Sequence, residues 1–272
     1  MSSTNDSQQK DLIRDRFTKT AEVFADFAVS YRAQFADGLA RMVSAKPTDT
    51  VVDLACGPGT LALQFARHTG WVCAVDLTPA MLDRARATAR GDGLGNLGFT
   101  IGDVQSLPIG SGSLDLAVTS YSLHHMPDPG RVVREMARVV KRGGRVGVID
   151  IVVPEDPARA EAANRIEIAR DASHTRSLGR RDFDEIFGAA GLRVIASEVH
   201  EMPRLFDHWL HVAGWHRGDA VYAETRRLMV ATMKDDFAGF HPRYAAADAG
   251  KPEDERGIEM VNTAMFIAAE KM

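Results

Sequence analysis

The sequence predicts an α/β fold in which a seven-stranded, mostly parallel sheet has helices on both faces, an antiparallel last strand and helical lid elements. From residue 51 onward, short β-branched apolar runs alternate with segments whose apolar residues recur at three- and four-residue steps. The short runs are typical of buried strands and the stepped segments of amphipathic helices, which together indicate strand–helix–strand units. We expect strands at 51–54, 71–76, 97–101, 114–120, 145–152, 192–199 and 260–269, the last an antiparallel partner at the sheet edge.

Capping residues mark the starts and ends of the predicted helices. Thr78 and Asp128 each stand before a proline, Pro79 and Pro129, at the first helical position. Gly143, followed by a second glycine, would supply the left-handed end of the helix that starts at Pro129.

With 272 residues the chain can bury roughly three quarters of its unfolded surface, and we expect one domain. Residues 1–47 would form an N-terminal helical cap, 48–152 the core, and 153–272 the C-terminal half, with a helical insertion at about 203–256. Residues 1–10 should be frayed. The cap is expected to hold two amphipathic segments whose apolar positions are Leu12, Ile13, Phe17, Ala21, Phe24, Phe27, Ala28 and Tyr31, then Phe35, Leu39 and Met42.

The composition is that of an ordinary soluble protein, with 45% hydrophobic and 26% charged residues. A net charge of −4 gives no reason to expect nucleic acid as a partner. We expect a cytoplasmic protein without a membrane span, because no run approaches ~18 apolar residues and the polar start lacks the core of a signal peptide. Cys56 and Cys73 should be reduced, and no cysteine spacing indicates a metal site. The sequence leaves a homodimer open.

A glycine turn follows the first predicted strand. In VVDLACGPGT (51–60), Gly57 and Gly59 leave no Cβ in the turn, so the backbone can approach a ligand closely. With Ala62 they match the glycine-glycine-alanine form of the dinucleotide fingerprint, which is a weak signal by itself. Free amides at the start of the next helix would favour a nucleotide-like or carboxylate-bearing ligand.

Polar residues end the next three strands. Asp76 ends the second strand, where a carboxylate can accept both ribose hydroxyls of an adenosine. Asp103 follows the third strand, where it can accept the exocyclic amine of adenine, and Ser120 and Tyr121 end the fourth. The carboxyl ends of parallel strands form the crevice in which open α/β sheets bind their ligands. The sequence therefore predicts an adenosine-type site at this edge.

In this region the chain resembles the class I S-adenosylmethionine-dependent methyltransferases, and within them the small-molecule branch that includes the ubiquinone/menaquinone-biosynthesis type. Each motif is common by itself, but their joint order and spacing over about residues 50–152 are specific. The resemblance implies a Rossmann-like fold, S-adenosyl-L-methionine as the cofactor and methyl transfer to a small-molecule acceptor. The motifs are VVDLACGPG (51–59), AVDLTPAML (74–82), GDVQSLP (102–108), LDLAV (114–118), LHHM (123–126) and REMARVVKRGG (134–144).

The cofactor-binding positions that the resemblance implies all follow the first four strands. The resemblance implies that Asp53, Ala55, Gly57 and Gly59 receive the methionine portion of the cofactor and that Asp76 holds the ribose. Leu77 and Met81 would flank the adenosine, and Asp103 and Val104 would surround the adenine. The backbone of Ser120, with Tyr121 next to it, would meet the methionine amine.

Two positions depart from the family's pattern. Ala55 stands where many relatives have glycine, a change that should be tolerable if its φ angle is negative. Phe24 stands where many have tyrosine, so a hydroxyl contact near the cofactor is in doubt.

Three histidines are the candidate catalytic residues. Methyl transfer from a sulfonium is an in-line displacement, so the protein positions the acceptor, excludes water and, where needed, removes a proton. Histidine is the usual proton acceptor near neutral pH. His124 and His125 follow the fourth strand, close to the expected methyl group, and His174 lies in a segment that can roof the site. The structural alternative is that these loop histidines only form hydrogen bonds to the backbone.

The roof of the site is expected from the N-terminal helices, residues 154–181 and the insertion at 203–256. Its aromatic side chains would suit a small, partly apolar acceptor such as an aromatic or quinone-like compound, although the same side chains can also be core. They are Phe17, Phe24, Phe27, Trp209 and Trp215.

Other functions compete for the same pattern. A nicotinamide-dependent oxidoreductase can use such a glycine turn, but no tyrosine here is followed four places later by lysine. A non-catalytic S-adenosylmethionine-binding regulator would carry the same binding residues. A metal-dependent methyltransferase would need a ligand cluster, and a thiol-based arsenic methyltransferase would need more cysteines than two.

Overall fold

The structure, a computed structural model, describes residues 6–27 and 33–272. The expected apolar positions Ala28 and Tyr31 lie outside these residues. The sheet is built from β1 (Thr50–Leu54), β2 (Trp71–Asp76), β3 (Leu97–Ile101), β4 (Leu114–Ser120), β5 (Val140–Ile151), β6 (Leu192–Leu205), β7 (Arg243–Tyr244) and β8 (Ile258–Lys271).

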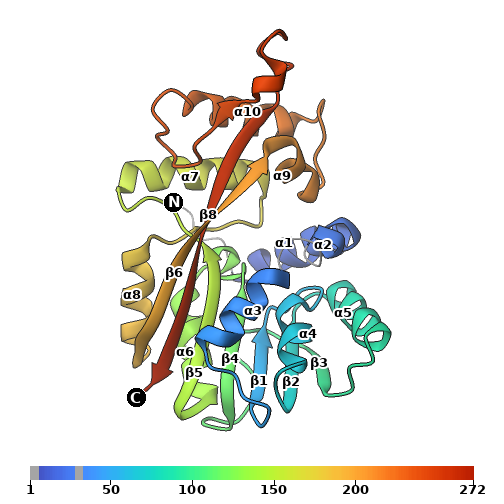
Figure 1. Ribbon diagram of the computed structural model, residues 1–272, viewed down its shortest axis with the longest axis vertical. Helices are drawn as coiled ribbons and strands as arrows, with labels where there is room; N and C mark the ends of the chain where they lie inside the picture. The colour runs from blue at the N-terminus through green and yellow to red at the C-terminus, as the bar shows by residue number, and fades with distance from the viewer. Residues whose placement is uncertain (1–5, 28–32) are drawn as a thin grey trace.

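The strand order is β3-β2-β1-β4-β5-β8-β6, with the short β7 paired to β8 (Figure 1). Strands β1 to β5 are parallel, whereas β8 is antiparallel to both of its neighbours. The predicted fold class is confirmed. One detail was wrong: the last strand lies inside the sheet, and β6 occupies the edge. Every residue of β8 from Ala264 to Ala269 is apolar and buried, which suits a strand that is paired on both sides.

Three helices cover one face of the sheet. They are α3 (Ala33–Met42), α4 (Thr60–Ala66) and α5 (Pro79–Gly91). Leu39, Phe65 and Leu82, one from each helix, are buried in a common core with Val51 of β1. These residues sit at helical spacing in the sequence, so amphipathic patterning explains this layer.

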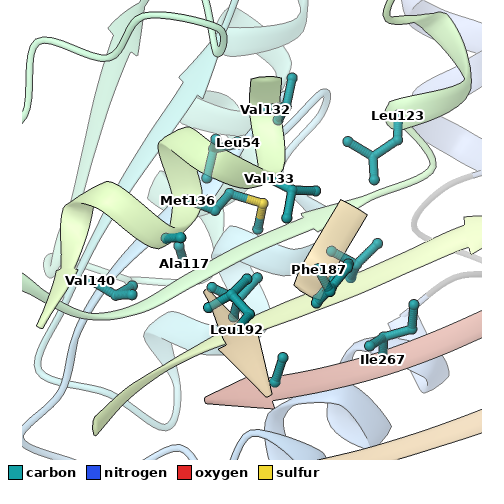
Figure 2. Packing of buried hydrophobic residues seen from close by; sticks show 14 of the residues in the cluster. Leu54, Ala117, Leu123, Val132, Val133, Met136, Val140, Phe187, Leu192 and Ile267 are labelled. Atoms are coloured by element: carbon teal, nitrogen blue, oxygen red, sulfur yellow. The ribbon is translucent and has the colours of Figure 1, made fainter. Parts of the chain in front are cut away.

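The opposite face is covered by α6 (Pro129–Val139) and α8 (Arg180–Ala189). Met136 of α6 and Phe187 of α8 are buried in one cluster with Leu54 and Ala117 of the sheet and Leu192 of β6 (Figure 2). Asp128 caps α6, as predicted, by accepting a hydrogen bond from the Arg131 amide at 3.0 Å. Burial on both faces explains why the central strands are continuous apolar runs.

A third group of helices lies beyond the carboxyl ends of the parallel strands (Figure 1). It consists of α7 (Pro157–Arg170), α9 (Phe206–Val212) and α10 (Ala220–Ala231), which share a core around Ile166, Phe206 and Met229. The helices α1 (Asp6–Lys19) and α2 (Ala21–Phe27) lie at the same end. These elements roof the sheet edge where the site was predicted.

Three boundaries differ from the sequence expectation. Residues 6–10 are helical, not frayed, because Gln9 donates to the carbonyl oxygens of His125 and Ser173 at 2.9 and 2.6 Å. Gly143 has the expected left-handed φ of 73° but lies within β5, since α6 has already ended at Val139. Residues 203–205, expected to be helical, extend β6 because β8 continues to pair with them.

In the part of the chain that the structure describes, no helix is both long enough and apolar enough to cross a membrane.

Candidate active site

A cleft of about 860 Å³ lies at the carboxyl ends of β1 to β4. We call it the cleft from here on. It brings together most of the residues that the sequence assigned to cofactor binding, although they come from four separate strand ends. The predicted residues that line it are Ala55, Gly57, Asp76, Leu77, Met81, Asp103, Val104, Ser120, Tyr121 and His125.

The turn after β1 forms one wall of the cleft. Gly57 adopts a φ of 53°, in the left-handed region that favours glycine, and its amide donates to Asp76 Oδ2 at 2.8 Å. Ala55 also has a positive φ, 51°, so the condition under which we expected alanine to be tolerable is not met. This conformation costs an alanine about 1 kcal/mol or more, and the turn carries that strain beside the cleft.

Two predicted residues lie behind the turn and do not line the cleft. Asp53 is 1% exposed and accepts a hydrogen bond from the Ala62 amide at 2.9 Å. Burial raises the pKa of Asp53 well above its usual value. Gly59 has a φ of 92°, and a Cβ there would lie 3.0 Å from the Cβ of Ala85. Both residues therefore shape the turn and its packing against the helices.

Asp76 is the buried acid of the cleft wall. Besides the Gly57 amide, it accepts a hydrogen bond from the Thr78 amide at 2.8 Å through Oδ1. Burial raises the pKa of Asp76, and these two donors act in the opposite direction. Thr78 occupies the expected N-cap position of α5, but its side chain makes no capping bond. Asp76 thus ties two turns together while it faces the cleft.

At the far end of the cleft, Asp103 is held by groups that the sequence did not single out. Its Oδ1 accepts from the Gln105 amide at 2.9 Å, and its Oδ2 lies 2.8 Å from Lys10 Nζ of α1. Lys10 also pairs with Asp6, whose pKa is lowered by hydrogen bonds from Lys10 and Gln105. Lys10 lies 93 positions before Asp103, so no local motif connects the two.

A second cavity, of about 580 Å³, adjoins the cleft and is called the chamber below. The two share four lining residues, Phe17, Phe24, Tyr121 and His125. The other residues that line the chamber are mostly aromatic or charged, and they come from α1, α2, the turn after β4, α7 and the loop after it, α9, the ends of β5 and β6, and β8. They are Arg16, Phe27, His124, Ile151, Glu167, Arg170, Asp171, Arg204, Trp209, Val212 and Asn262.

Ion pairs organise the charged side of the chamber. Arg16 lies 3.2 Å from Asp171, and Arg170 lies 3.0 Å from Glu167. Burial raises the pKa of Asp171, but Arg16, His125, Arg170 and the Ser173 hydrogen bond together outweigh this effect, and the net pKa is well below its usual value. The guanidinium of Arg170 also stacks 4.5 Å from the ring of Trp209. Trp215, which we expected in the pocket, instead donates to the Arg170 carbonyl at 2.8 Å and does not line the chamber.

The three histidines form one cluster but differ in access to the cavities. His125 lines both cavities, His124 lines the chamber, and His174 lines neither. The rings of His124 and His174 stack at 5.3 Å, with His174 behind. Burial lowers the pKa of His125 to about 3 and also lowers that of His174. Asp150, at the end of β5, lies 2.5 Å from His124.

Asp150 is the residue that sequence reasoning could have found. It is an acid close to the end of an apolar strand, a signal similar to the one that identified Asp76 at the end of its strand. Gln9 and Ser173, which contact the cluster, carry no such signal, because they meet the histidines only through tertiary packing.

The chain is similar in sequence to known methyltransferases. A family model described as a methyltransferase domain matches residues 51–144. The uncharacterized methyltransferase YcgJ of Bacillus subtilis is 30% identical over 198 residues, which is 73% of this chain and 78% of that protein. The chain belongs to the class I S-adenosylmethionine-dependent methyltransferases. The family membership implied by the sequence motifs is confirmed.

Other members of this methyltransferase family extend the likeness. A ubiquinone/menaquinone biosynthesis C-methyltransferase, UbiE of Bdellovibrio bacteriovorus, is 31% identical over 153 residues, or 54% of this chain and 65% of that protein. The crystal structure of B. subtilis YcgJ superposes with a TM-score of 0.76 at 26% identity, over 88% of this chain and 98% of that one. Geranyl diphosphate C-methyltransferase from Streptomyces coelicolor, in complex with S-adenosyl-L-homocysteine, shares the fold alone, with a TM-score of 0.58, 16% identity and coverage of 89% and 79%.

The family implies S-adenosylmethionine as the cofactor, and the cleft fits that group. Its lining combines apolar side chains with a few polar groups such as Asp76 and Asp103, which is typical of small-molecule sites. A Cβ built on Gly57 would meet nothing closer than a ring atom of Phe24 at 3.9 Å, so the missing side chain leaves the backbone open to a ligand. Asp76 supplies a carboxylate that is already oriented by two backbone amides.

Proposed function

We propose that the chain transfers a methyl group from S-adenosyl-L-methionine to a small, partly apolar acceptor with a carbon, oxygen or nitrogen nucleophile. One observation carries the proposal: a cleft lined by the family's motif residues adjoins a second cavity lined by other parts of the chain, and four residues line both. Two adjoining cavities provide separate places for cofactor and acceptor, as a two-substrate transfer requires.

In this proposal each end of the cleft receives a different part of the cofactor. Asp76 accepts the ribose hydroxyls, while Asp103 and Val104 surround the adenine. Leu77 and Met81 flank the adenosine. The turn at 55–57 and the strand end at 120–121 meet the methionine group. Asp53 and Gly59 contribute indirectly, because they hold the turn in shape from behind.

The cofactor, when bound, supplies an electrophilic methyl group, so the chain's own residues have three tasks. They orient the acceptor, exclude water and accept a proton. The chamber, with Phe17, Phe24, Phe27 and Trp209 in its walls, offers an apolar surface for the acceptor. Of the three histidines, His124 and His125 face this cavity and are the proposed catalytic candidates. His174 lies behind them.

Calorimetry tests the cofactor assignment. The protein should bind S-adenosylmethionine and S-adenosylhomocysteine saturably and should not bind NAD(H). Saturable binding of NAD(H) alone would exclude the methyltransferase and favour a nicotinamide-dependent oxidoreductase.

Turnover is tested separately, because binding residues alone do not distinguish an enzyme from a regulator. Incubation with cell extract and methyl-labelled S-adenosylmethionine, followed by mass spectrometry, should reveal a labelled small molecule. Tight cofactor binding without any label transfer would favour a non-catalytic regulator.

We also propose that the chain works as one domain in the cytoplasm. Cys56 and Cys73 are both free thiols, which suits a reducing compartment. A single cooperative unfolding transition and recovery in the cytoplasmic fraction are the expected results.

A further inference from the structure

Asp150 holds the imidazole of His124 in one orientation. The carboxylate is 1% exposed, and its Oδ1 lies 2.5 Å from His124 Nδ1. The same carboxylate accepts from the amides of Leu123 and Ile151, each at 2.8 Å. These two backbone donors therefore hold the carboxylate of Asp150 in place independently of His124. An acceptor-only carboxylate next to Nδ1 selects the tautomer in which Nδ1 carries the proton.

This tautomer leaves Nε2 of His124 as a proton acceptor. Among the described residues, no hydrogen bond is made to Nε2, and Nε2 is not among the buried atoms that lack a partner. The atom is therefore accessible, and the cavity that His124 lines is the chamber. A basic nitrogen thus faces the cavity proposed for the acceptor.

Neither neighbouring histidine has this combination of features. His125 faces both cavities, but its Nδ1 lies 3.0 Å from the neutral carbonyl of Ser173, which stabilises an imidazolium less than a carboxylate does. His174 Nε2 lies 3.0 Å from Asn164 Oδ1, and its ring lines neither cavity. Only His124 of the three pairs a carboxylate on one nitrogen with access on the other.

We infer that His124 is the general base of methyl transfer, that Asp150 is its positioning residue, and that the acceptor bears a phenolic or enolic hydroxyl bound in the chamber. The inference rests on the proposed function and names the substrate class of that same site. A neutral imidazole matches such a hydroxyl better than an aliphatic alcohol, because an aromatic hydroxyl ionises near pH 10.

The proton and electron balance is simple. The acceptor O–H proton passes to His124 Nε2, and the resulting anion attacks the methyl carbon of the sulfonium. The new bond forms from oxygen, or from the ring carbon next to it, as the carbon–sulfur bond breaks. After attack on carbon, the ring carbon loses its own proton to water. S-adenosylhomocysteine leaves, and the imidazolium returns its proton to solvent.

The chamber suits a flat, ionising acceptor. Its aromatic walls include Trp209 and Phe17, which can stack on a ring. Three arginines against two carboxylates, Glu167 and Asp171, give the lining an excess of positive charge that favours a developing oxyanion. The charged and titratable groups around His124 are His125 from its own turn, Asp150 from β5, Asp171 and His174 from the loop after α7, Glu167 and Arg170 from α7, Arg204 from β6, and Arg16 from α1.

The first test does not depend on the acceptor. Histidine ring NMR of the S-adenosylhomocysteine complex should show His124 with the proton on Nδ1 in the wild type. In Asp150→Asn the amide can donate to Nδ1, so the proton should move to Nε2. An Nε2 proton in the wild type, or the same tautomer in both proteins, would overturn the role of Asp150.

The second test measures label transfer from methyl-labelled S-adenosylmethionine into cell extract. His124→Gln and Asp150→Asn should each lower the rate about 10²- to 10⁴-fold at pH 7 while cofactor affinity stays within about twofold. The His124→Gln rate should rise with pH as the acceptor hydroxyl ionises by itself. His241→Gln, an exposed histidine paired with Asp236, is the matched control and should leave the rate unchanged.

Failure of the proposed function and failure of the His124 inference give different experimental results. If the wild type binds the cofactor and transfers no label, the proposed function fails, whatever the NMR shows. If the wild type transfers label and both variants stay within about threefold of it, the function stands and the inference is wrong. Label found by mass spectrometry on an amine or a thioether would overturn the acceptor class.

Discussion

The cleft and the chamber meet at four residues, yet they are built in different ways. Most walls of the cleft are short segments that directly follow a parallel strand, such as the turn at 55–57 after β1, and α1 and α2 complete the lining. The chamber is assembled from helices, a strand-end turn and three late strand segments, separated by up to 246 positions between Arg16 and Asn262. The first can be read from local motifs, whereas the second exists only after the chain has packed.

This contrast separates what the family shares from what the individual protein recognises. The cleft is made of backbone turns and strand-end acids, which suit a cofactor common to many proteins. The chamber is made of side chains that lie outside the motif region for the most part, and we propose that it holds the acceptor particular to this chain. Changes in the cleft should affect cofactor binding, and changes in the chamber should affect the acceptor alone.

The largest effect is expected from Asp76→Ala. The change removes the proposed acceptor of two ribose hydroxyls, and hydrogen bonds to a charged group contribute about 1.5–3 kcal/mol each, so affinity for S-adenosylmethionine should fall at least about 100-fold. Calorimetry measures this change in affinity. Asp83→Ala, an exposed acid on α5 that pairs with Arg86, is the control. Equal affinity in wild type and Asp76→Ala would mean that the ribose lies elsewhere.

Trp209→Leu tests the same contrast between the two cavities by changing the chamber. The ring lines the chamber and carries the Arg170 guanidinium, so its loss should raise the KM for the acceptor about tenfold. Affinity for S-adenosylmethionine should stay within about twofold, because the side chain does not line the cleft. Label-transfer kinetics and calorimetry check the two halves. A weakened cofactor affinity with an unchanged KM would reverse the assignment of the cavities.

The buried histidines at the junction should make stability depend on pH. The pKa of His125 is about 3 in the folded chain, below its unfolded value of about 6.5, so the unfolded state alone takes up a proton between these values. Stability is then fully present above pH 6.5 and falls as the pH drops, by about 1.4 kcal/mol per pH unit for this residue. His174 and Asp171 act in the same direction.

Urea unfolding at pH 7.5 and pH 5.0 measures this dependence. His125→Gln should reduce the difference in unfolding free energy by about 2 kcal/mol, whereas exposed His241→Gln should not change it. If the unfolding free energy changes equally between the two pH values in wild type and in His125→Gln, His125 takes up its proton in the folded state as readily as in the unfolded one.

The smallest effect is expected at the strained turn. Ala55→Gly relieves a positive φ of 51° and should raise the free energy of unfolding by about 0.5–1 kcal/mol, net of the extra chain entropy of glycine. Chemical denaturation is sensitive enough to detect it. A less stable glycine variant would indicate that the methyl group of Ala55 contributes packing that outweighs the strain.

The sequence predicted the fold class and most of the cleft, because both depend on local patterns. Strands β2, β3 and β4 begin and end where their apolar runs do, and Asp76 and Asp103 end up in one cleft because parallel strands end together. Asp53 and Gly59 share the same motif but lie behind the turn. Spacing alone does not distinguish a residue that faces the ligand from one that supports the loop.

Four of the five aromatic residues expected in the roof do line the chamber, but its charged side and the fixed start of α1 could not be predicted for a physical reason. Gln9 and Lys10 become ordered through bonds to residues more than 90 positions away, and such contacts leave no periodic pattern in the sequence. The interior position of β8 is likewise set by pairing with both β5 and β6. For Asp150, the strand-end signal was present, but its meaning depends on the facing histidine.

A crystal structure of the protein with S-adenosylhomocysteine tests the central claim most directly. The account predicts the ribose hydroxyls on Asp76, the adenine beside Asp103 and Val104, and the sulfur directed toward the junction at His125, with the chamber left free. An adenosine group bound in the chamber against Trp209 would contradict it.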